Sequence, residues 1–237
     1  WRHGVRAPVL AGMPAPECSG PDGARAKVRE VIAAGADFVK LASTGGVSSP
    51  DLDPRQPLFS DAEIRAIVDE AHAAGRRVAC HAIGGPGVLT AIRAGVDSIE
   101  HGVWLDDEAL DELAARGTWY VPTLAAYELH RRQGPPLQRA RAEEMVPAHR
   151  DSVRRAQRAG VRIACGSDGG VYGYDVILEL ELLVGAGLAP SEALVAATSS
   201  AAACLGWDDR LGAVARPSGS GKRCGRCGRC WRASRWK

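Results

Sequence analysis

The sequence predicts an α/β protein in which strands and helices alternate, arranged as a (β/α)₈ TIM-like barrel. Three observations lead to this fold class. Short apolar runs of strand length alternate with segments of helical periodicity, and a glycine ends the helix before each run. Side chains able to do chemistry stand at or near the carboxyl ends of several runs. A doubly wound sheet would show the same alternation, but a barrel gathers its strand ends around one mouth, so the third observation favours the barrel.

Five parallel strands are expected. In chain order they cover residues 36–42, 77–82, 96–101, 118–124 and 161–168. Each is a short apolar run that follows a helix ending in glycine, which is the pattern of repeated β/α units. A loop rich in proline and aspartate, residues 43–60, follows the first strand.

The helices are expected before, between and after these strands. They cover residues 22–35, 61–74, 84–95, 106–116, 137–159, 174–186 and 190–205. In the first helix, Val28 and Ile32 recur at helical spacing. Ser60 and Glu63 form a capping box that opens the second. The long fifth helix is expected to break near Pro147, because proline has no amide hydrogen to donate.

Composition and charge are those of an ordinary soluble globular chain, 46% hydrophobic and 24% charged. The 30 basic and 28 acidic residues leave a net charge of +2, so no global field favours nucleic acid or membrane as a partner. No apolar run approaches the roughly 18 residues of a membrane span. Scattered cysteines such as Cys80 and Cys165 are expected to be reduced and buried. The chain starts at Trp1, so the compartment stays open, with a cytoplasmic location favoured.

Four residues at or near strand ends suggest a divalent-metal site: Lys40, His81, His101 and Asp168. Neutral imidazole suits Zn²⁺, and a carboxylate can complete the shell or act as a base. A lysine ammonium cannot bind a cation, so Lys40 would have to react with CO₂ and become a carbamate. A single strand-end histidine is more often a packing residue, but four such residues in consistent positions indicate a site.

The motifs around these residues resemble a known family, the metal-dependent amidohydrolase superfamily. They are Val39–Lys40 leading into Thr44–Gly46, Cys80–Gly84, Ser98–Gly102 and Cys165–Asp168. The branch most similar to the chain contains imidazolonepropionase-like hydrolases and Xaa-Pro and Xaa-Arg/Lys dipeptidases. The resemblance runs from about Gly20 to Val214.

The resemblance implies a role for each residue of the set. Lys40, carbamylated, would bridge two Zn²⁺ ions from strand 4, and His81 and His101 would bind metal from strands 5 and 6. Asp168, from strand 8, would bind metal and act as the catalytic base and acid. A metal-bridged hydroxide would then cleave an amide-type C–N bond. Dipeptides, N-acyl amino acids or cyclic amides are the implied small-molecule substrates, with lactones and phosphotriesters as the alternative.

The chain also departs from the family pattern. It contains no His-x-His pair, which the family carries on strand 1, so strands 4–8 are expected here and strands 1–3 are not. Residues 1–21 are expected to form a loop region and residues 22–210 the C-terminal part of the barrel. The alternative to an active hydrolase is therefore a catalytically inactive, N-terminally truncated barrel fragment. A homo-oligomer is also possible.

The last residues, 211–237, are expected to form an atypical basic tail. Cys224, Cys227 and Cys230 have the C-x₂-C-x₂-C spacing of zinc or iron–sulfur ligands, but no fourth ligand follows. Our preferred account is a frameshift in a GC-rich gene. A small metal-binding module and a short basic arm that binds nucleic acid are the alternatives.

Three further residues are candidates for substrate binding. Tyr127, close to a strand end, could donate a hydrogen bond to a substrate carbonyl or simply pack at the barrel rim. Gly45 and Gly46 could let a loop approach the substrate closely or merely form a turn.

Other polar residues are expected to have ordinary roles. His130 and His149 lie in polar helical sequence and are expected to be solvated. Glu100 is expected to point away from His101, because neighbouring strand residues face opposite sides.

Overall fold

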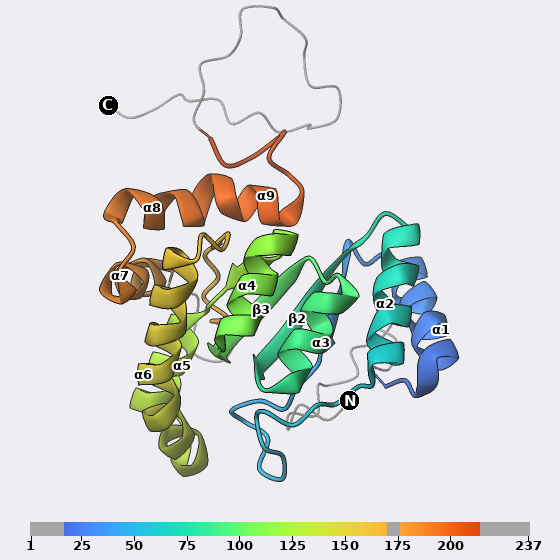
Figure 1. Cartoon of the computed structure of the whole chain (residues 1–237), viewed down its shortest axis with the longest axis horizontal. Helices are drawn as coiled ribbons and strands as arrows, with labels where there is room; N and C mark the ends of the chain where they lie inside the picture. Colours follow the sequence, from blue (N-terminus) through green and yellow to red (C-terminus); the bar gives the residue numbers. More distant parts are fainter. Residues whose placement is uncertain (1–16, 170–175, 214–237) are drawn as a thin grey trace, which may run out of the picture.

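The computed structural model describes residues 17–169 and 176–213, and within them four parallel strands form one sheet (Figure 1). The strands are β1 (Phe38–Ala42), β2 (Arg77–Gly84), β3 (Ser98–Trp104) and β4 (Trp119–Val121). Their order in the sheet is their order in the chain, so each strand is reached by a crossover through a helix. This is the repeated β/α unit that the sequence predicts.

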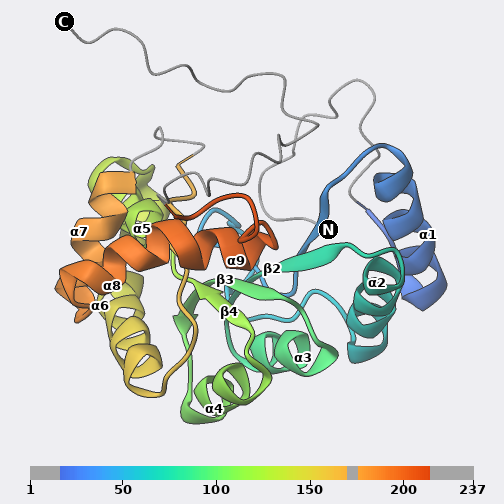
Figure 2. The same cartoon turned by 90° about the horizontal axis from the view of Figure 1, so that it is seen from above.

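Helices surround the sheet. They are α1 (Gly20–Ala33), α2 (Asp61–Ala73), α3 (Pro86–Ala94), α4 (Asp107–Arg116), α5 (Leu124–Gln133), α6 (Pro136–Arg158), α7 (Val176–Ala186), α8 (Pro190–Val195) and α9 (Ala201–Leu205), with a π-helical turn, Ala196–Ser200, between the last two. Figure 2 shows α3 and α4 on one side of the strands, and α8 and α9 across the other. Within the described residues, no helix is long and apolar enough to cross a membrane.

The predicted helix boundaries rest on caps that the structure contains. The Ser60 backbone amide donates to the Glu63 carboxylate at 2.8 Å, and the Glu63 amide donates back to the Ser60 hydroxyl at 3.4 Å. This confirms the capping box. Gly95 and Gly117 end α3 and α4 with left-handed backbones, at φ of 92° and 64°. Glycine tolerates this conformation without steric cost, so the chain can turn directly from each of these helices into the next strand.

The main core lies between the sheet and helices α1 to α4. One face of the sheet contributes alternate strand residues, and the helices contribute branched side chains. All are buried: Val39, Leu41, Val78, Cys80, Ile99 and Tyr120 from the strands, and Ile64, Val68, Ile92 and Leu113 from the helices. Cys80 is therefore a buried thiol, as expected, and burial raises its pKa to about 11.

The opposite face of the sheet is polar toward the carboxyl ends of the strands. Register aligns Ala42 with His81 and His81 with Glu100, so their side chains share this inner face. Trp119 and Val121 of β4, in register with Ser98 and Glu100, form a small cluster, against which Ala203 and Cys204 of α9 pack. Helix α9 thus covers the inner face beside β4.

The fifth predicted strand is only partly formed. Residues 161–168 follow β4 in the expected place, but they make a single parallel bridge, between Tyr120 and Ile163. Tyr120 receives from Ala164 at 3.0 Å and donates to Arg162 at 2.9 Å. The next amide, that of Cys165, bonds to a helical carbonyl, Ala196 O, at 2.9 Å. The pairing with β4 stops because the next donor in register, Pro122, has no amide hydrogen.

Two helical expectations are corrected. Helix α6 runs through Pro147 without a break. Proline removes one backbone hydrogen bond, but Met145, His149 and Ser152 are buried on either side of it, and this packing holds the helix together. Helix α5 forms where the sequence predicts no helix. The predictions for residues 1–16 and for the cysteines of the tail concern residues outside the described ranges.

Candidate active site

His81 and His101 lie against each other on the inner face of the sheet. Their ring centroids are 4.5 Å apart and the rings meet edge to face at 67°. Both side chains are buried, with 5% and 6% of their surface exposed. Neighbouring parallel strands therefore bring together two of the four residues that the sequence singles out.

The backbone of His101 is what allows this contact. His101 pairs with Ala82, the neighbour of His81, so regular alternation would send the His101 side chain to the opposite face. Instead His101 has a φ of 77°, in the left-handed region. The expectation that Glu100 points away from His101 is therefore wrong, because alternation fails at this residue and both side chains serve the inner face.

Three non-glycine residues near the candidate site have a strained backbone: His101 within β3, Thr123 just after β4, and Asp168 at the end of the segment 161–168. Within the described chain, the non-glycine residues with positive φ are His101, Thr123 at 58° and Asp168 at 46°. Such conformations cost of order 1–3 kcal/mol each and persist only where the surroundings impose them. Two of the three are residues expected to bind metal, and the third contacts His101.

Each imidazole has a hydrogen-bond partner that sets its orientation. His81 Nε2 donates to the carbonyl oxygen of Gly45 at 2.9 Å. His101 Nδ1 lies 2.7 Å from the hydroxyl of Thr123. Coordination of a metal would then use the other ring nitrogen in each case, Nδ1 of His81 and Nε2 of His101. Partners of this kind fix the tautomer of metal-binding histidines.

The loop between β1 and α2 presents the Gly45 carbonyl to His81. A Cβ at Gly45 would lie 2.6 Å from the Asp53 carbonyl oxygen, so no other residue fits without a backbone shift. The Gly46 amide donates to Ser49 Oγ at 3.3 Å. The two glycines therefore shape a tight loop at the site, and their predicted contact with substrate stays a prediction.

Lys40, Glu100 and Asp168 are ionisable residues near the two histidines, and the charges of Lys40 and Asp168 both act on Glu100. Lys40 is exposed and shares its face of the sheet with His81. Burial raises the pKa of Glu100, the positive charge of Lys40 lowers it, and Asp168 raises it further. Ser98 Oγ donates to Glu100 at 2.5 Å. Glu100 is a site residue that the alternation rule missed.

Tyr127, on α5, lies beside the two histidines. It is 3% exposed, and its ring centroid is 5.7 Å from that of His101. Burial, followed by the charge of Asp168, raises the pKa of Tyr127 well above its ordinary value, so the phenol stays neutral. The hydroxyl therefore keeps its proton, and the predicted hydrogen bond from Tyr127 to a substrate stays a prediction.

His130 and His149 are buried, contrary to expectation, with 8% and 0% of their surface exposed. Burial lowers the pKa of His149 to about 3, so its ring stays neutral. Its ring centroid is 4.9 Å from that of Tyr127. The signal that could have found His149 is its spacing from Met145 and Ser152, which share the buried face of α6.

A buried carboxylate, that of Glu179, holds the start of the helix that carries Tyr127. Glu179 of α7 accepts the backbone amides of Leu124 at 3.0 Å and Ala125 at 2.6 Å. These are the first residues of α5, which follows Thr123. Burial raises the pKa of Glu179 to about 7, although the amides act to lower it. No local sequence pattern connects Glu179 with residues so distant in the chain.

The side chains gathered at the site supply some of the ligands that a divalent cation such as Zn²⁺ needs. Two buried imidazoles with oriented partners fit Zn²⁺. Within residues 17–169 and 176–213, however, no group of three or more histidine, cysteine, aspartate or glutamate side chains is close enough to hold a metal ion. The described chain assembles half of the expected ligand set.

Comparison with known proteins gives the family. Residues 2–216 match the Amidohydrolase family. The chain belongs to this family. The amidohydrolase is 34% identical to the ochratoxinase of Aspergillus niger over 192 residues, which are 79% of this chain and 40% of the relative. It is also 34% identical to the imidazolonepropionase of Symbiobacterium thermophilum over 167 residues, 66% of this chain and 35% of the relative.

A solved relative confirms the fold class of the amidohydrolase. The crystal structure of a Xaa-Pro dipeptidase with bound methionine in the active site aligns at a TM-score of 0.77 and 38% identity, over 82% of this chain and 50% of that one. The parallel sheet and its helices are thus part of a TIM barrel. The chain spans about half or less of the length of these relatives.

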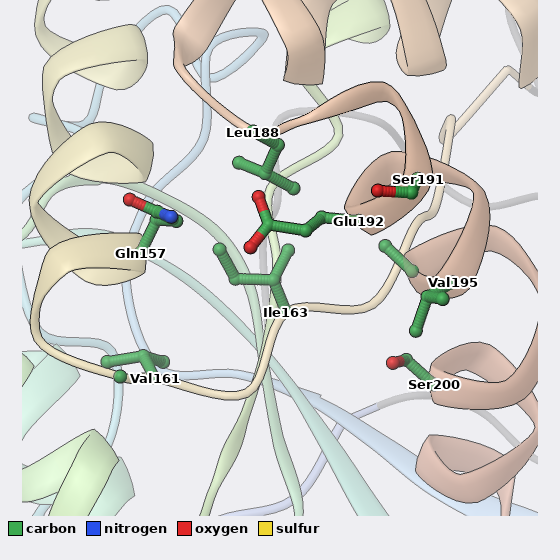
Figure 3. A pocket seen from close by; sticks show the side chains of 10 residues that line it. Gln157, Val161, Ile163, Leu188, Ser191, Glu192, Val195 and Ser200 are labelled. Carbon is green, nitrogen blue, oxygen red and sulfur yellow. The ribbon is translucent and has the colours of Figure 1, made fainter.

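A cavity of about 330 Å³ has no histidine among the residues that line it (Figure 3). The cavity is lined by the end of α6, the start of the segment 161–168, the connection from α7 to α8, and α8 with the π-helical turn that follows it. The lining residues include Gln157, Ile163, Leu188, Glu192 and Val195. Ile163 stands near the amino end of its segment. Barrel enzymes place catalytic groups at the carboxyl ends, so this cavity is not the candidate active site.

Proposed function

We propose that the chain carries the C-terminal part of a metal-dependent hydrolase that cleaves an amide-type C–N bond. The observation that carries this proposal is the contact between His81 and His101, at neighbouring strands of an amidohydrolase barrel. Each ring is oriented by its own partner, Gly45 or Thr123, as metal-binding histidines are.

Four residues of the chain would hold the metal: His81, His101, Asp168 and, after carbamylation, Lys40. A bound Zn²⁺ lowers the pKa of water to about 7 and polarises a carbonyl oxygen. Asp168 would accept a proton from the attacking water and deliver it to the leaving nitrogen. The neutral phenol of Tyr127 would donate a hydrogen bond to a substrate oxygen, and the loop at Gly45 and Gly46 would border the substrate.

The relatives suggest the substrate class. One is called an ochratoxinase, one a Xaa-Pro dipeptidase and one an imidazolonepropionase. We infer that this chain acts on a small amide: a dipeptide with C-terminal proline, arginine or lysine, an N-acyl amino acid, or a cyclic amide. Lactones and phosphotriesters are open to the same attack at an electrophilic centre and are the alternative substrates.

A second candidate function has its own support. The described residues bring only two imidazoles together, and no group of three ligands is assembled among them. A chain with this site could fold as part of a barrel and bind metal too weakly to catalyse. This candidate is an inactive member of the amidohydrolase family.

Metal stoichiometry separates the two candidates. The hydrolase candidate predicts about two metal ions per chain, measured by elemental analysis after purification with Zn²⁺ and bicarbonate. His101→Ala should lose metal, whereas His72→Ala, at an exposed histidine that bonds Asp97, should not. One ion or none in the unchanged chain would favour the inactive candidate. With two ions, hydrolysis of Xaa-Pro and Xaa-Arg dipeptides is the next assay.

A further inference from the structure

Arg141 of α6 reaches across to the loop between β1 and α2, which is the light blue loop at the bottom of Figure 1. Its Nη1 donates to the carbonyl oxygens of Ser49 at 2.6 Å and Gly46 at 3.2 Å, and its Nη2 donates to that of Leu52 at 3.1 Å. Nη1 also lies 3.4 Å from the carbonyl of Val47. One guanidinium therefore ties together the carbonyls of a loop some 90 residues away in the chain.

Arginine suits this arrangement for a physical reason. Its guanidinium is planar, always charged, and carries five N–H donors in a fixed fork, so one side chain can satisfy several carbonyl oxygens at once. A charged donor makes stronger hydrogen bonds than a neutral one. Other arginines of the neighbourhood act differently: Arg131 and Arg132 both pair with the buried carboxylate of Glu128. Arg141 is distinctive because its partners are backbone.

The loop that Arg141 holds is the loop that orients His81. Gly45 precedes the first of the clamped carbonyls, Gly46 O, and its own oxygen accepts the proton on His81 Nε2 at 2.9 Å. Ser49, whose carbonyl oxygen is also bound by Arg141, accepts a hydrogen bond from the Gly46 amide through its hydroxyl. Movement of the Gly46 carbonyl would therefore move the peptide that receives the histidine.

We propose that Arg141 is a positioning residue that clamps this loop and thereby fixes the tautomer and orientation of His81. The proposal rests on the proposed function insofar as His81 serves as a metal ligand. It goes beyond that function by assigning the support of the ligand to a residue of a distant helix. Arg141 acts on the imidazole of His81 through the Gly45 peptide.

The test uses the whole chain without metal. We compare the unchanged chain with Arg141→Met, Arg141→Lys and a control, Arg139→Met, at an exposed arginine of the same helix. Hydrogen exchange of residues 44–57 reports the loop, and ¹⁵N NMR of the imidazoles reports the tautomer of His81. Arg141→Met should speed amide hydrogen exchange in this loop by about 10- to 100-fold. This factor corresponds to the free energy that hydrogen bonds from a charged donor contribute. The substitution should also mix the tautomers of His81.

Arg141→Lys should restore part of the loop protection, because an ammonium retains the charge but not the fork. If Arg141→Met does not fold, the comparison between the lysine variant and the unchanged chain decides. Unchanged exchange in 44–57, or faster exchange with an unaltered His81 tautomer, would overturn the proposal. Zn²⁺ titration is a separate readout, with an expected loss of about 10- to 100-fold in affinity. Failure of the unchanged chain to bind Zn²⁺ would refute the proposed function, and the two metal-free readouts would still decide on Arg141.

Discussion

His149 donates a hydrogen bond of 2.7 Å from Nε2 to the main-chain oxygen of His101. The acceptor belongs to a residue whose left-handed backbone turns its side chain toward His81. A buried, neutral imidazole on α6 thus supports the peptide that gives the site its geometry. The same ring packs edge to face on Tyr127, so one side chain of α6 supports two elements of the site.

Removal of this support should cost stability. His149→Ala leaves a cavity and an unpaired carbonyl, and we expect the free energy of unfolding to fall by about 2–4 kcal/mol. Urea denaturation followed by circular dichroism measures it. His72→Ala removes a half-exposed histidine bonded to Asp97 and should cost less than about 1 kcal/mol. Equal losses in the two variants would contradict the role of His149.

Thr123→Ala tests the partner of His101. The substitution removes the hydroxyl that lies 2.7 Å from Nδ1, so the ring loses the contact that sets its orientation. We expect Zn²⁺ affinity to drop by about 10- to 100-fold, measured by calorimetric titration. Thr90→Ala, which removes an exposed hydroxyl bonded to Asp61, should leave the affinity unchanged. The role of Thr123 is refuted if both variants bind Zn²⁺ as tightly as the unchanged chain.

Glu179 should make stability depend on pH. Its pKa is raised from 4.5 to about 7 by burial, so the folded state holds the proton more tightly than the unfolded state does. The stability that protonation provides is complete below about pH 4.5 and is lost as the pH rises through about 7. The total amounts to roughly 3 kcal/mol.

Glu179→Gln isolates this effect. The amide does not titrate, so the difference in unfolding free energy between the unchanged chain and the variant should change between pH 5 and pH 8, with the unchanged chain losing more. Every other titrating group cancels in this difference. A difference that is constant across the range would show that Glu179 is already ionised at pH 5 in the folded chain.

Gly45→Ala tests the shape of the loop. The new Cβ would meet the Asp53 carbonyl at 2.6 Å, so the backbone must shift and the bond to His81 must lengthen. We expect a loss of about 1–3 kcal/mol in unfolding free energy, as for other overpacked sites. Gly23→Ala is the matched control, because its Cβ meets nothing within 4 Å and lies in α1. This control should gain about 0.5–1 kcal/mol in stability. An equal effect of the two substitutions would disprove the close approach at Gly45.

Local sequence carries much of the fold. Periodicity and glycine placement depend on residues within a few positions of each other, so the described helices other than α5, and four of the five strands, could be predicted from them. The fifth strand stays incomplete because Pro122 cannot donate the next hydrogen bond to it, and because Cys165, on its other edge, bonds to Ala196 of a distant segment. Pro147 was misjudged for a related reason: burial of its neighbours outweighs the one lost hydrogen bond.

The chemical groups at the candidate site can be identified from the amino-acid sequence: two histidines, an aspartate and a lysine in a repeated β/α pattern. How these groups meet depends on the folded structure. The left-handed turn at His101, the support from His149 and the reach of Arg141 to the loop all join residues far apart in the chain. Their positions depend on packing between elements, and no local pattern encodes such long-range contacts.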